Sequence, residues 1–365
     1  MSVHEQYMAR ALQLAERGLF TTDPNPRVGC VIVNDGEIVG EGWHQRAGEG
    51  HAEVNALQVA GNKAKGADCY VSLEPCSHFG RTPPCADALI KSGLKRVFVA
   101  MKDPNPLVSG NGVKRLKKAG IDVTVGLLKQ QAKDLNPGFC KRMQSGRPYV
   151  RSKIAMSLDG RTATASGESK WITGPDARQD VQKLRARSSV ILTGMATILE
   201  DDPALTVRPK GDWYPEDQVI RQPLRVVVGS QNIPQTAKLF ETADTVLLAS
   251  SSDTSTEVKE EVLTLAGQKG HIDLVALMSE LAKREINEIM VEAGSRLNGA
   301  LLEAGLIDEL IIYMAPKLMG DSAKGLFHLP ALQTMAQNIE LTITDIRAVG
   351  KDWRITAIPE YTKVR

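Results

Sequence analysis

Short apolar runs alternate with amphipathic helical stretches along most of the chain, and this alternation restricts the fold to layered α/β domains. In the first part we expect helices at 5–17, from residue 51, from residue 85 and at 112–119, and strands at 68–73, 96–100 and 122–125, after a hairpin that turns at 34–36. A second series starts at residue 149, with strands near 189–193, 224–228, 245–249, 288–292 and 309–315. The Gly- and Pro-containing segment 136–148 is interpreted as a linker, so two domains are expected, 1–146 and 147–365.

Composition narrows the class of protein. A chain of 365 residues with 42% hydrophobic content can fill two cores. A net charge of +2 and 4% aromatic residues provide neither a basic stripe nor a stacking surface, so the expected partner is a small molecule, and neither nucleic acid nor a membrane. The N-terminal stretch follows an amphipathic helix pattern and lacks the apolar core of a signal peptide, which favours a cytoplasmic location.

Five cysteines in a cytoplasmic chain do not indicate a disulfide framework. Cys30 and Cys69 lie in apolar strand-like runs, where a thiol behaves as a small hydrophobic side chain, and Cys140 has no ligand-like neighbour. Cys76 and Cys85 differ because each follows a proline. Cys76 comes at the end of an apolar strand and Cys85 at the start of a helix, where the helix dipole favours a thiolate.

The stretch HAEVNAL, which begins at His51, completes a set of metal ligands. His51, Cys76 and Cys85 would give zinc three protein ligands and an open fourth position, as in catalytic sites. Glu53 lies two positions after His51, so one of the two should coordinate and the other carry protons. H-x-E followed by P-C and a second cysteine is the signature of zinc nucleobase deaminases, although eight residues separate the cysteines here. The alternative is a closed structural zinc with His78 as the fourth ligand, which leaves Glu53 without a role.

Several stretches of the chain resemble one known family. TTDPNPRVGCVIV, GEGWHQRAGEGHAEVNAL, LEPCSHFGRTPPC and DPNPLVSGNG are similar to the deaminase half of the bifunctional riboflavin biosynthesis family, and SLDGRTATASGESKWIT, ILEDDPALTVR and VEAGSRLNGALLEAGLIDEL are similar to its reductase half. That family joins a diaminohydroxyphosphoribosylaminopyrimidine deaminase to a 5-amino-6-(5-phosphoribosylamino)uracil reductase. The resemblance implies a cytidine-deaminase-like α/β/α domain with a mixed sheet, a dihydrofolate-reductase-like α/β domain, Zn²⁺ and NADPH as cofactors, and a homodimer.

The resemblance also implies roles for residues of the first domain. His51, Cys76 and Cys85 bind zinc, and Glu53 donates and accepts protons while an amino group is removed from the pyrimidine of a ribosylamino phosphate. Loop residues are expected to hold this substrate, and His44 or Arg81 would suit its phosphate; the set is Asn25, His44, Arg81 and Asn105. Each of these four has an alternative role as a turn former or a solvated surface residue.

The second domain carries a less specific signal. EIMVEAGSRLNGALLEAG places Gly294 between a strand and a helix, where backbone N–H groups can hold a cofactor phosphate, but such glycines are common without a ligand. The resemblance implies an NADPH site formed by Ala155, Trp171, Thr197, Asp201, Ser230, Gly294, Ser295, Arg296, Leu297, Asn298, Gly299 and Ala300. On the substrate side it implies Ser169, Arg185, Leu205, Arg208 and Glu292, in which two arginines suit a phosphate. A solvated helix face is the alternative for Arg185, and Lys153 is a further candidate, to polarise the ribose carbonyl for hydride transfer.

Two other classes of protein are alternatives to a bifunctional riboflavin biosynthesis enzyme. A nucleic-acid-editing deaminase would need a basic face and stacking aromatic residues, which the composition does not supply. A zinc-stabilised module without catalysis would be insensitive to replacement of Glu53 by glutamine.

Overall fold

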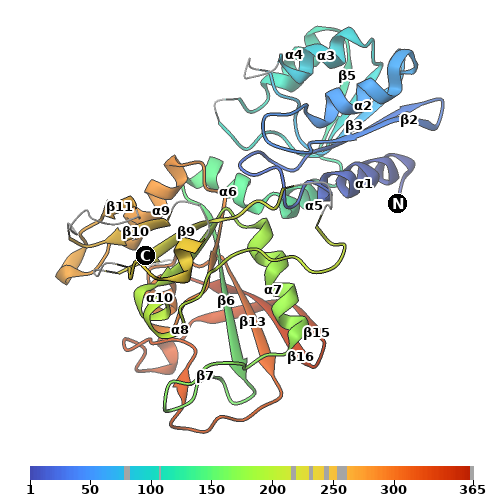
Figure 1. Cartoon of the computed structure of the whole chain (residues 1–365). Coiled ribbons are helices and arrows are strands. Elements are labelled where there is room, and N and C mark those ends of the chain that lie inside the picture. Colours follow the sequence, from blue (N-terminus) through green and yellow to red (C-terminus); the bar gives the residue numbers. More distant parts are fainter. Residues whose placement is uncertain are drawn as a thin grey trace. The chain divides into compact units, whose positions relative to one another are not determined.

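The computed structural model describes residues 1–77, 83–106, 108–214, 219–229, 233–241, 246–252 and 261–361. The chain divides into two compact units, Met1–Arg147 and Pro148–Arg365 (Figure 1). Among the described residues, no helix combines the length and the apolar character needed to cross a bilayer.

The first unit is built on a mixed sheet of five strands. These are β1 (Gly29–Asn34), β2 (Glu37–Trp43), β3 (Asp68–Val71), β4 (Arg96–Val99) and β5 (Asp122–Val125), in the order β2-β1-β3-β4-β5. β1 is antiparallel to β2 and β3, whereas β3, β4 and β5 are parallel. Asp35 and Gly36 join β1 to β2 with positive φ angles, as expected for a tight hairpin turn. The carboxyl ends of β3 and β4 meet at one edge, where α/β proteins place ligand sites.

Helices cover both faces of this sheet (Figure 1). A Cβ on Gly29 would lie 1.9 Å from Ala11 O, and one on Gly42 would lie 2.4 Å from Ala56 N, so two helices lie directly against β1 and β2. Because Gly29 pairs with Trp43, the neighbour of Gly42, the two glycines point to opposite faces. The helices are α1 (Val3–Glu16), α2 (Ala52–Ala60), η1 (Gly61–Ala64), α3 (Cys85–Lys91), α4 (Asn111–Lys118), α5 (Lys129–Leu135) and α6 (Pro137–Ser145).

The segment interpreted as a linker is mostly helical, which corrects that expectation. α6 occupies most of it, and Cys140 is buried in the core of the first unit. Pro137 lies in the first turn of α6, and Gly146 follows its last turn with a positive φ. Proline and glycine are common at helix ends as well as in loops, which is why they suggested a linker here. Asn136 accepts a hydrogen bond from Arg27 N at 2.8 Å and donates one to Arg27 O at 2.9 Å, which fastens this segment to the first unit.

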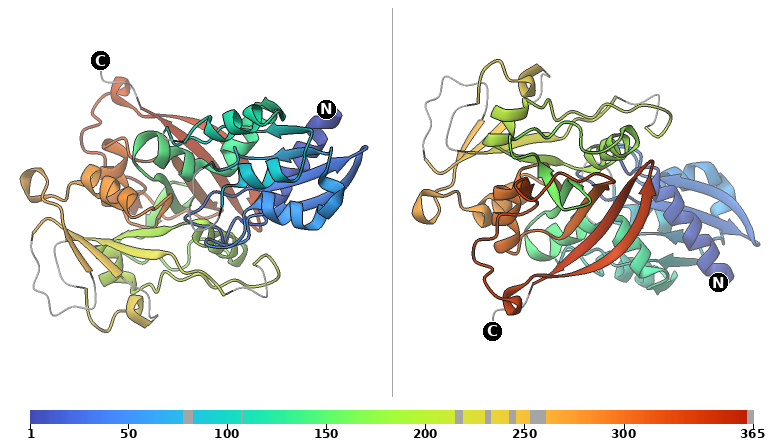
Figure 2. Two further views of the ribbon diagram at one scale, coloured as in Figure 1. Left: turned by 90° about the horizontal axis from the view of Figure 1, so that it is seen from above. Right: turned by 90° about the horizontal axis from the view of Figure 1, so that it is seen from below.

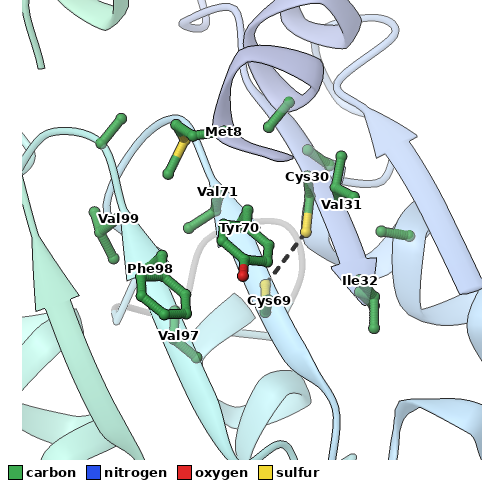
Figure 3. Close-up of a cluster of buried hydrophobic side chains, with 14 of the residues drawn as sticks. Met8, Cys30, Val31, Ile32, Cys69, Tyr70, Val71, Val97, Phe98 and Val99 are labelled. Atoms are coloured by element: carbon green, nitrogen blue, oxygen red, sulfur yellow. Dashed lines mark hydrogen bonds between the residues drawn. The ribbon is translucent and has the colours of Figure 1, made fainter. Parts of the chain in front are cut away.

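Cys30 and Cys69 are buried in the first core, as predicted (Figure 3). Both are free thiols on neighbouring strands, and their sulfur atoms lie 3.4 Å apart. Tyr70 and Phe98 stack beside them with ring centroids 4.7 Å apart. These two cysteines therefore act as core side chains.

The second unit has a nine-stranded sheet in the order β11-β10-β9-β8-β12-β6-β13-β16-β15. Neighbouring strands from β11 to β13 are parallel, and β16 and β15 add an antiparallel hairpin at the edge (Figure 2). The sequence pattern did not single out this hairpin as a pair of strands. The bounds are β6 (Tyr149–Ser157), β8 (Val190–Gly194), β9 (Leu224–Val228), β10 (Val246–Ser250), β11 (Glu261–Thr264), β12 (Glu288–Val291), β13 (Glu309–Ala315), β15 (Glu340–Val349) and β16 (Asp352–Glu360), with β7 (Arg161–Ala163) and β14 (Lys324–Gly325) in a small separate sheet.

Alternate residues of the central strands fill two cores. Met290 and Tyr313 pack against Val181 of α7, while Ile289 and Leu310 belong to the core that contains α9 and α10. Helices therefore cover both faces of this sheet as well. They are α7 (Pro175–Arg187), α8 (Met195–Asp201), η2 (Lys238–Glu241), η3 (Gln268–Gly270), α9 (Leu274–Lys283), α10 (Ser295–Glu303) and η4 (Met335–Gln337).

Candidate active sites

The three predicted metal ligands converge in the first unit. His51 Nδ1 lies 3.2 Å from Cys85 Sγ and 3.6 Å from Cys76 Sγ. All three ligand atoms lie within 4.8 Å of one another, and no other His, Cys, Asp and Glu side chains of the described residues form such a group. The prediction that these residues lie together is confirmed.

Local structure explains why the ligands meet. His51 is the N-cap of α2. This helix lies directly on β2, where Gly40 permits a close approach: a Cβ at this position would come within 2.4 Å of Ala56 O. Cys76 lies shortly after β3, and Cys85 is the first residue of α3. The Cys85 N–H donates to Cys76 Sγ at 3.2 Å, so the start of α3 holds the first thiol.

The arrangement fits a zinc ion. Tetrahedral zinc binds sulfur at about 2.3 Å and nitrogen at about 2.0 Å, which places neighbouring ligand atoms about 3.5 Å apart or slightly more. Hydrogen bonding with the Cys85 thiol and with His51 lowers the pKa of Cys76, which favours the thiolate form that metal binding requires. One imidazole and two thiolates leave a fourth position open, which is the donor set of a catalytic zinc site.

Glu53 lies in the first turn of α2 and is only 3% exposed. It is not part of the ligand group. Burial raises the pKa of its carboxyl to about 7, so that it can both accept and donate a proton near neutral pH. The environment therefore suits the predicted proton carrier rather than a metal ligand.

His44 and Asn25 lie beside the metal ligands. Asn25 Nδ2 is 3.0 Å from His44 Nε2, His44 Nδ1 is 3.2 Å from Gly50 O, and the rings of His44 and His51 meet edge to face with centroids 5.3 Å apart. Burial lowers the pKa of His44, and both ring nitrogens face partners within the protein. The assignment of His44 to the substrate phosphate stays a prediction.

The other two expected substrate residues of this domain are placed differently. Asn105 lies in the loop after β4, where its N–H donates to Asp103 Oδ1 at 2.8 Å and its carbonyl accepts from Val108 and Ser109. Arg81 lies outside the described residues, as does His78, the fourth ligand of the alternative structural zinc.

One buried carboxylate of this region, Glu74, was not predicted from the sequence. Glu74 is 5% exposed and accepts backbone hydrogen bonds from Asp103, Gly110 and Val113 at 2.9–3.1 Å. It thereby connects the strand end before Cys76 to the loop that contains Asn105 and to the start of α4. An acidic residue between a buried strand and a Pro-Cys pair is the only signal in the sequence that could have drawn attention to it.

Lys153, Arg185 and Glu292 form an ion cluster in the second unit. Arg185 donates two hydrogen bonds to the Glu292 carboxylate, at 2.6 and 3.1 Å, and Lys153 Nζ lies 3.4 Å from Glu292 Oε2. Arg185 also donates to Thr206 O at 3.0 Å. Its side chain is buried, so the alternative of a solvated helix face is wrong, and its guanidinium is engaged within the protein.

The cluster keeps Glu292 ionised. Burial acts to raise the pKa of this carboxyl, but Arg185 and Lys153 outweigh burial and hold it at about 2. Thr193 at the end of β8 donates to Glu292 O at 2.7 Å and fixes the main chain after β12. The cluster thus presents a fixed anion between two cations at the carboxyl ends of the parallel strands, where such sheets bind ligands.

The start of α10 fits a cofactor phosphate. Gly294 is the N-cap, and among the described residues no side chain caps this helix and no atom lies within 4 Å of a Cβ built on Gly294. A helix start with free space and uncapped N–H groups is a suitable place for the phosphates of NADPH. Gly294, Ser295, Arg296 and Leu297 form this helix start, and their assignment to the cofactor stays a prediction.

Two members of the expected cofactor set have other partners. Asn298 is 1% exposed; it donates to Ala293 O at 2.7 Å and accepts from Ser152 Oγ at 2.7 Å. A Cβ on Gly299 would lie 2.1 Å from His328 O, so a neighbouring loop covers this position. Both residues shape the turn at Gly294 from behind.

A cavity of about 450 Å³ is lined by Ser169, which was expected on the substrate side, and by Asp201, which was expected on the cofactor side; their side chains are hydrogen-bonded at 3.4 Å. Trp171 is 66% exposed, and Thr197 lies on α8. Leu205 is buried with a positive φ, so only its backbone is available to a substrate, while Arg208 has an exposed side chain. Ala155 is part of β6, and Ser230 lies outside the described residues.

Comparisons with known proteins agree with this geometry. Residues 1–101 match the family described as the cytidine and deoxycytidylate deaminase zinc-binding region, and residues 148–355 match the RibD C-terminal domain. The riboflavin biosynthesis protein RibD of Escherichia coli is 57% identical, over 95% of this chain and 97% of its own length. That of Haemophilus influenzae is 52% identical, over 97% of both chains.

Solved structures give the same result for the whole chain. Acinetobacter baumannii RibD superposes with a TM-score of 0.91 at 45% identity, and covers 98% of this chain and 99% of its own. A diaminohydroxyphosphoribosylaminopyrimidine deaminase/5-amino-6-(5-phosphoribosylamino)uracil reductase from Thermotoga maritima has a TM-score of 0.86 at 32% identity, with the same coverage. The expected fold, cofactors and pyrimidine substrate are thereby confirmed. The chain belongs to the RibD family of riboflavin biosynthesis proteins, bifunctional enzymes that combine a zinc-dependent deaminase with an NADPH-dependent reductase.

Proposed function

We propose that residues 1–146 perform the deamination and residues 147–365 the reduction, with the ligand and catalytic residues assigned above. The observation that carries the first assignment is the convergence of His51, Cys76 and Cys85, with the buried carboxyl of Glu53 in the same helix turn as the N-cap His51. Zinc, when bound, supplies a nucleophile for water addition at neutral pH. Glu53 accepts a proton from water and delivers it to the ring nitrogen of the pyrimidine, and it then carries a second proton, from the added hydroxyl, to the amine, which leaves as ammonia. Asn25, His44, Asn105 and Arg81 hold the substrate in this assignment.

In the second unit, Lys153 and Glu292 orient the ribose of the deaminated product. NADPH, when bound, supplies the hydride that reduces the sugar at C1. Lys153 donates a hydrogen bond to the ring oxygen of the ribose, which is released from C1 when hydride adds there and then takes up a proton, and Glu292 keeps this lysine in place by the 3.4 Å ion pair. Ser169, Arg208 and the backbone of Leu205 contact the phosphate end, and Arg185 acts chiefly through Glu292.

A coupled assay tests the division of labour. The purified chain is given the diaminopyrimidine substrate with NADPH, and ammonia and NADPH absorbance are followed together, with and without a zinc chelator. Chelation should stop ammonia release, whereas NADPH oxidation should persist when the deaminated intermediate is supplied directly. Ammonia release that survives complete zinc removal would contradict the first assignment, and chelator-sensitive oxidation of the supplied intermediate would contradict the second.

We also propose that the chain is a cytoplasmic homodimer. The free thiols of Cys30 and Cys69, 3.4 Å apart, suit a reducing compartment. Leu341, Ile343 and Ile346 of the edge strand β15 share one face with Trp353 of β16, and these four side chains are 43–56% exposed. An exposed apolar face on an edge strand supports pairing with a second copy, which would cover it.

Replacing Ile343 and Ile346 together by lysine should halve the mass measured by light scattering after size exclusion, because the two charges would be buried unpaired in the dimer. Val59→Lys is the control, since Val59 is a single exposed apolar side chain of the first unit at 67% exposure. A wild-type chain that is monomeric at micromolar concentration would refute the proposed dimer, and a double variant that stays dimeric would refute this interface.

A further inference from the structure

Arg115 connects the two segments that carry the zinc-ligand cysteines. From α4 its guanidinium pairs with Asp87, with Nε 2.7 Å from Oδ1 and Nη2 2.8 Å from Oδ2, and its Nη1 donates to Ser77 O at 3.2 Å. Ser77 follows Cys76, and Asp87 lies in the first turn of α3, two residues after Cys85. One side chain thus spans both ends of the insert that separates the cysteines.

The same two ends also contact each other directly. The N–H of Ala86 donates to Cys76 O at 3.1 Å, and that of Cys85 donates to Cys76 Sγ at 3.2 Å. The separation of the two sulfur atoms therefore depends on how α3 is seated against residues 76 and 77. Arg115 belongs to α4, and its side chain contacts both Asp87 of α3 and Ser77, the residue after Cys76.

Further contacts fix the position of α4 itself. Its start is bound by the carboxylate of Glu74, which accepts from the N–H groups of Gly110 and Val113 at 2.9 and 3.1 Å. A Cβ on Gly112 would lie 2.1 Å from Pro75 O, so the helix directly abuts the turn before Cys76. α4 therefore contacts the chain both before and after Cys76, and Arg115 extends this support to α3.

We propose that Arg115 is a positioning residue of the zinc site, which holds the Cys76 and Cys85 thiolates at the spacing the metal requires. This inference rests on the proposed ligand set. Its physical basis is that groups behind metal ligands orient them, and that loss of such a group typically lowers metal affinity by about 10–100-fold. A planar guanidinium suits this task because its fixed fork binds a carboxylate through two nitrogens while the third nitrogen edge reaches a carbonyl.

Zinc release into excess chromophoric chelator tests the proposal without reference to catalysis. Arg115→Met should release zinc at least about tenfold faster than the wild type. Arg115→Lys should rescue this only in part, because an ammonium cannot span both partners. Asp87→Asn, which keeps Arg115 and its bond to Ser77, should give a smaller increase in the same direction and replaces Arg115→Met if that variant does not fold.

Arg10→Met is a matched control. Arg10 pairs with Glu41 through two hydrogen bonds at 2.6 and 2.9 Å, and the exposures of its pair, 44% and 29%, match the 40% and 31% of Arg115 and Asp87. The two pairs are therefore similar in their cost to fold stability, but only one contacts the cysteine segments. Equal release rates for Arg115→Met, Asp87→Asn and the wild type, or equal acceleration by Arg10→Met, would overturn the proposal.

The outcome also separates this inference from the proposed function. If the wild-type chain holds no zinc, or if His51→Ala holds one equivalent as firmly as the wild type, the ligand assignment itself is wrong. If the wild type holds zinc through His51 and only the Arg115 series behaves as the wild type, the ligand set stands and the positioning role fails. If the proposal holds, Arg115→Met releases no ammonia at limiting zinc and regains ammonia release when excess zinc is added.

Discussion

Replacement of Glu53 by glutamine is expected to lower the rate of ammonia release by about 10²–10⁴-fold, while zinc content and reductase activity stay at wild-type levels. Glutamine has the same shape as glutamate but cannot carry a proton between the attacking water and the ring nitrogen. The side chain is 3% exposed and is not one of the metal ligands, so the change leaves the ligand set intact. Ammonia release, bound zinc and NADPH oxidation of the supplied intermediate should be measured on one preparation.

Glu74→Gln is a matched comparison for this variant, because Glu74 is also a buried carboxylate of the first unit. It binds three backbone N–H groups and carries no proton in the proposed reaction, so its loss should affect zinc retention and stability before chemistry. Unchanged ammonia release in Glu53→Gln would contradict the assignment of Glu53 as the proton carrier.

The first site could be predicted from the sequence because its ligands come in short motifs. His51 and Glu53 share one helix start, and Cys76 and Cys85 each follow a proline, so local chemistry alone indicated a metal. The contacts that hold the two cysteine segments together could not be predicted in this way. They come from Arg115, some thirty residues further along the chain than Cys85, and only the fold brings that side chain to Ser77 and Asp87.

The second site was predictable only through family resemblance. Lys153, Arg185 and Glu292 lie on a strand, a helix and a strand end that are far apart in sequence, and no local motif indicates that three charged side chains meet. For the same reason, Arg185 could be interpreted as a solvated helix residue. Periodicity also missed the hairpin of β15 and β16, because the bulge between Ile343 and Asp345 interrupts the alternation of apolar and polar residues along β15.

Replacement of Glu292 by glutamine is expected to abolish reductase activity and to lower the free energy of unfolding of the second unit by about 3–5 kcal/mol at neutral pH. The change removes the anion that lies between Arg185 and Lys153 and leaves one buried and one partly buried cation without a counter-charge. The exposed pair of Glu261 and Arg284 is the control. Glu261→Gln should lower the free energy of unfolding by at most about 1 kcal/mol, because the side chains of Glu261 and Arg284 are 47% and 37% exposed to water.

The stabilisation by ionised Glu292 should depend on pH. The pKa of Glu292 is about 2 in the folded chain and 4.5 for an ordinary glutamate, so its contribution of about 3 kcal/mol is complete above pH 4.5 and is lost as the pH falls towards 2. Denaturant unfolding followed by tryptophan fluorescence, to which Trp171, Trp213 and Trp353 of the second unit contribute, should therefore show a large difference between wild type and Glu292→Gln at pH 7 that shrinks below pH 4.5. A difference that is independent of pH would mean that the ion cluster does not hold Glu292 ionised. In that case Lys153 would lack the fixed partner on which its proposed role depends.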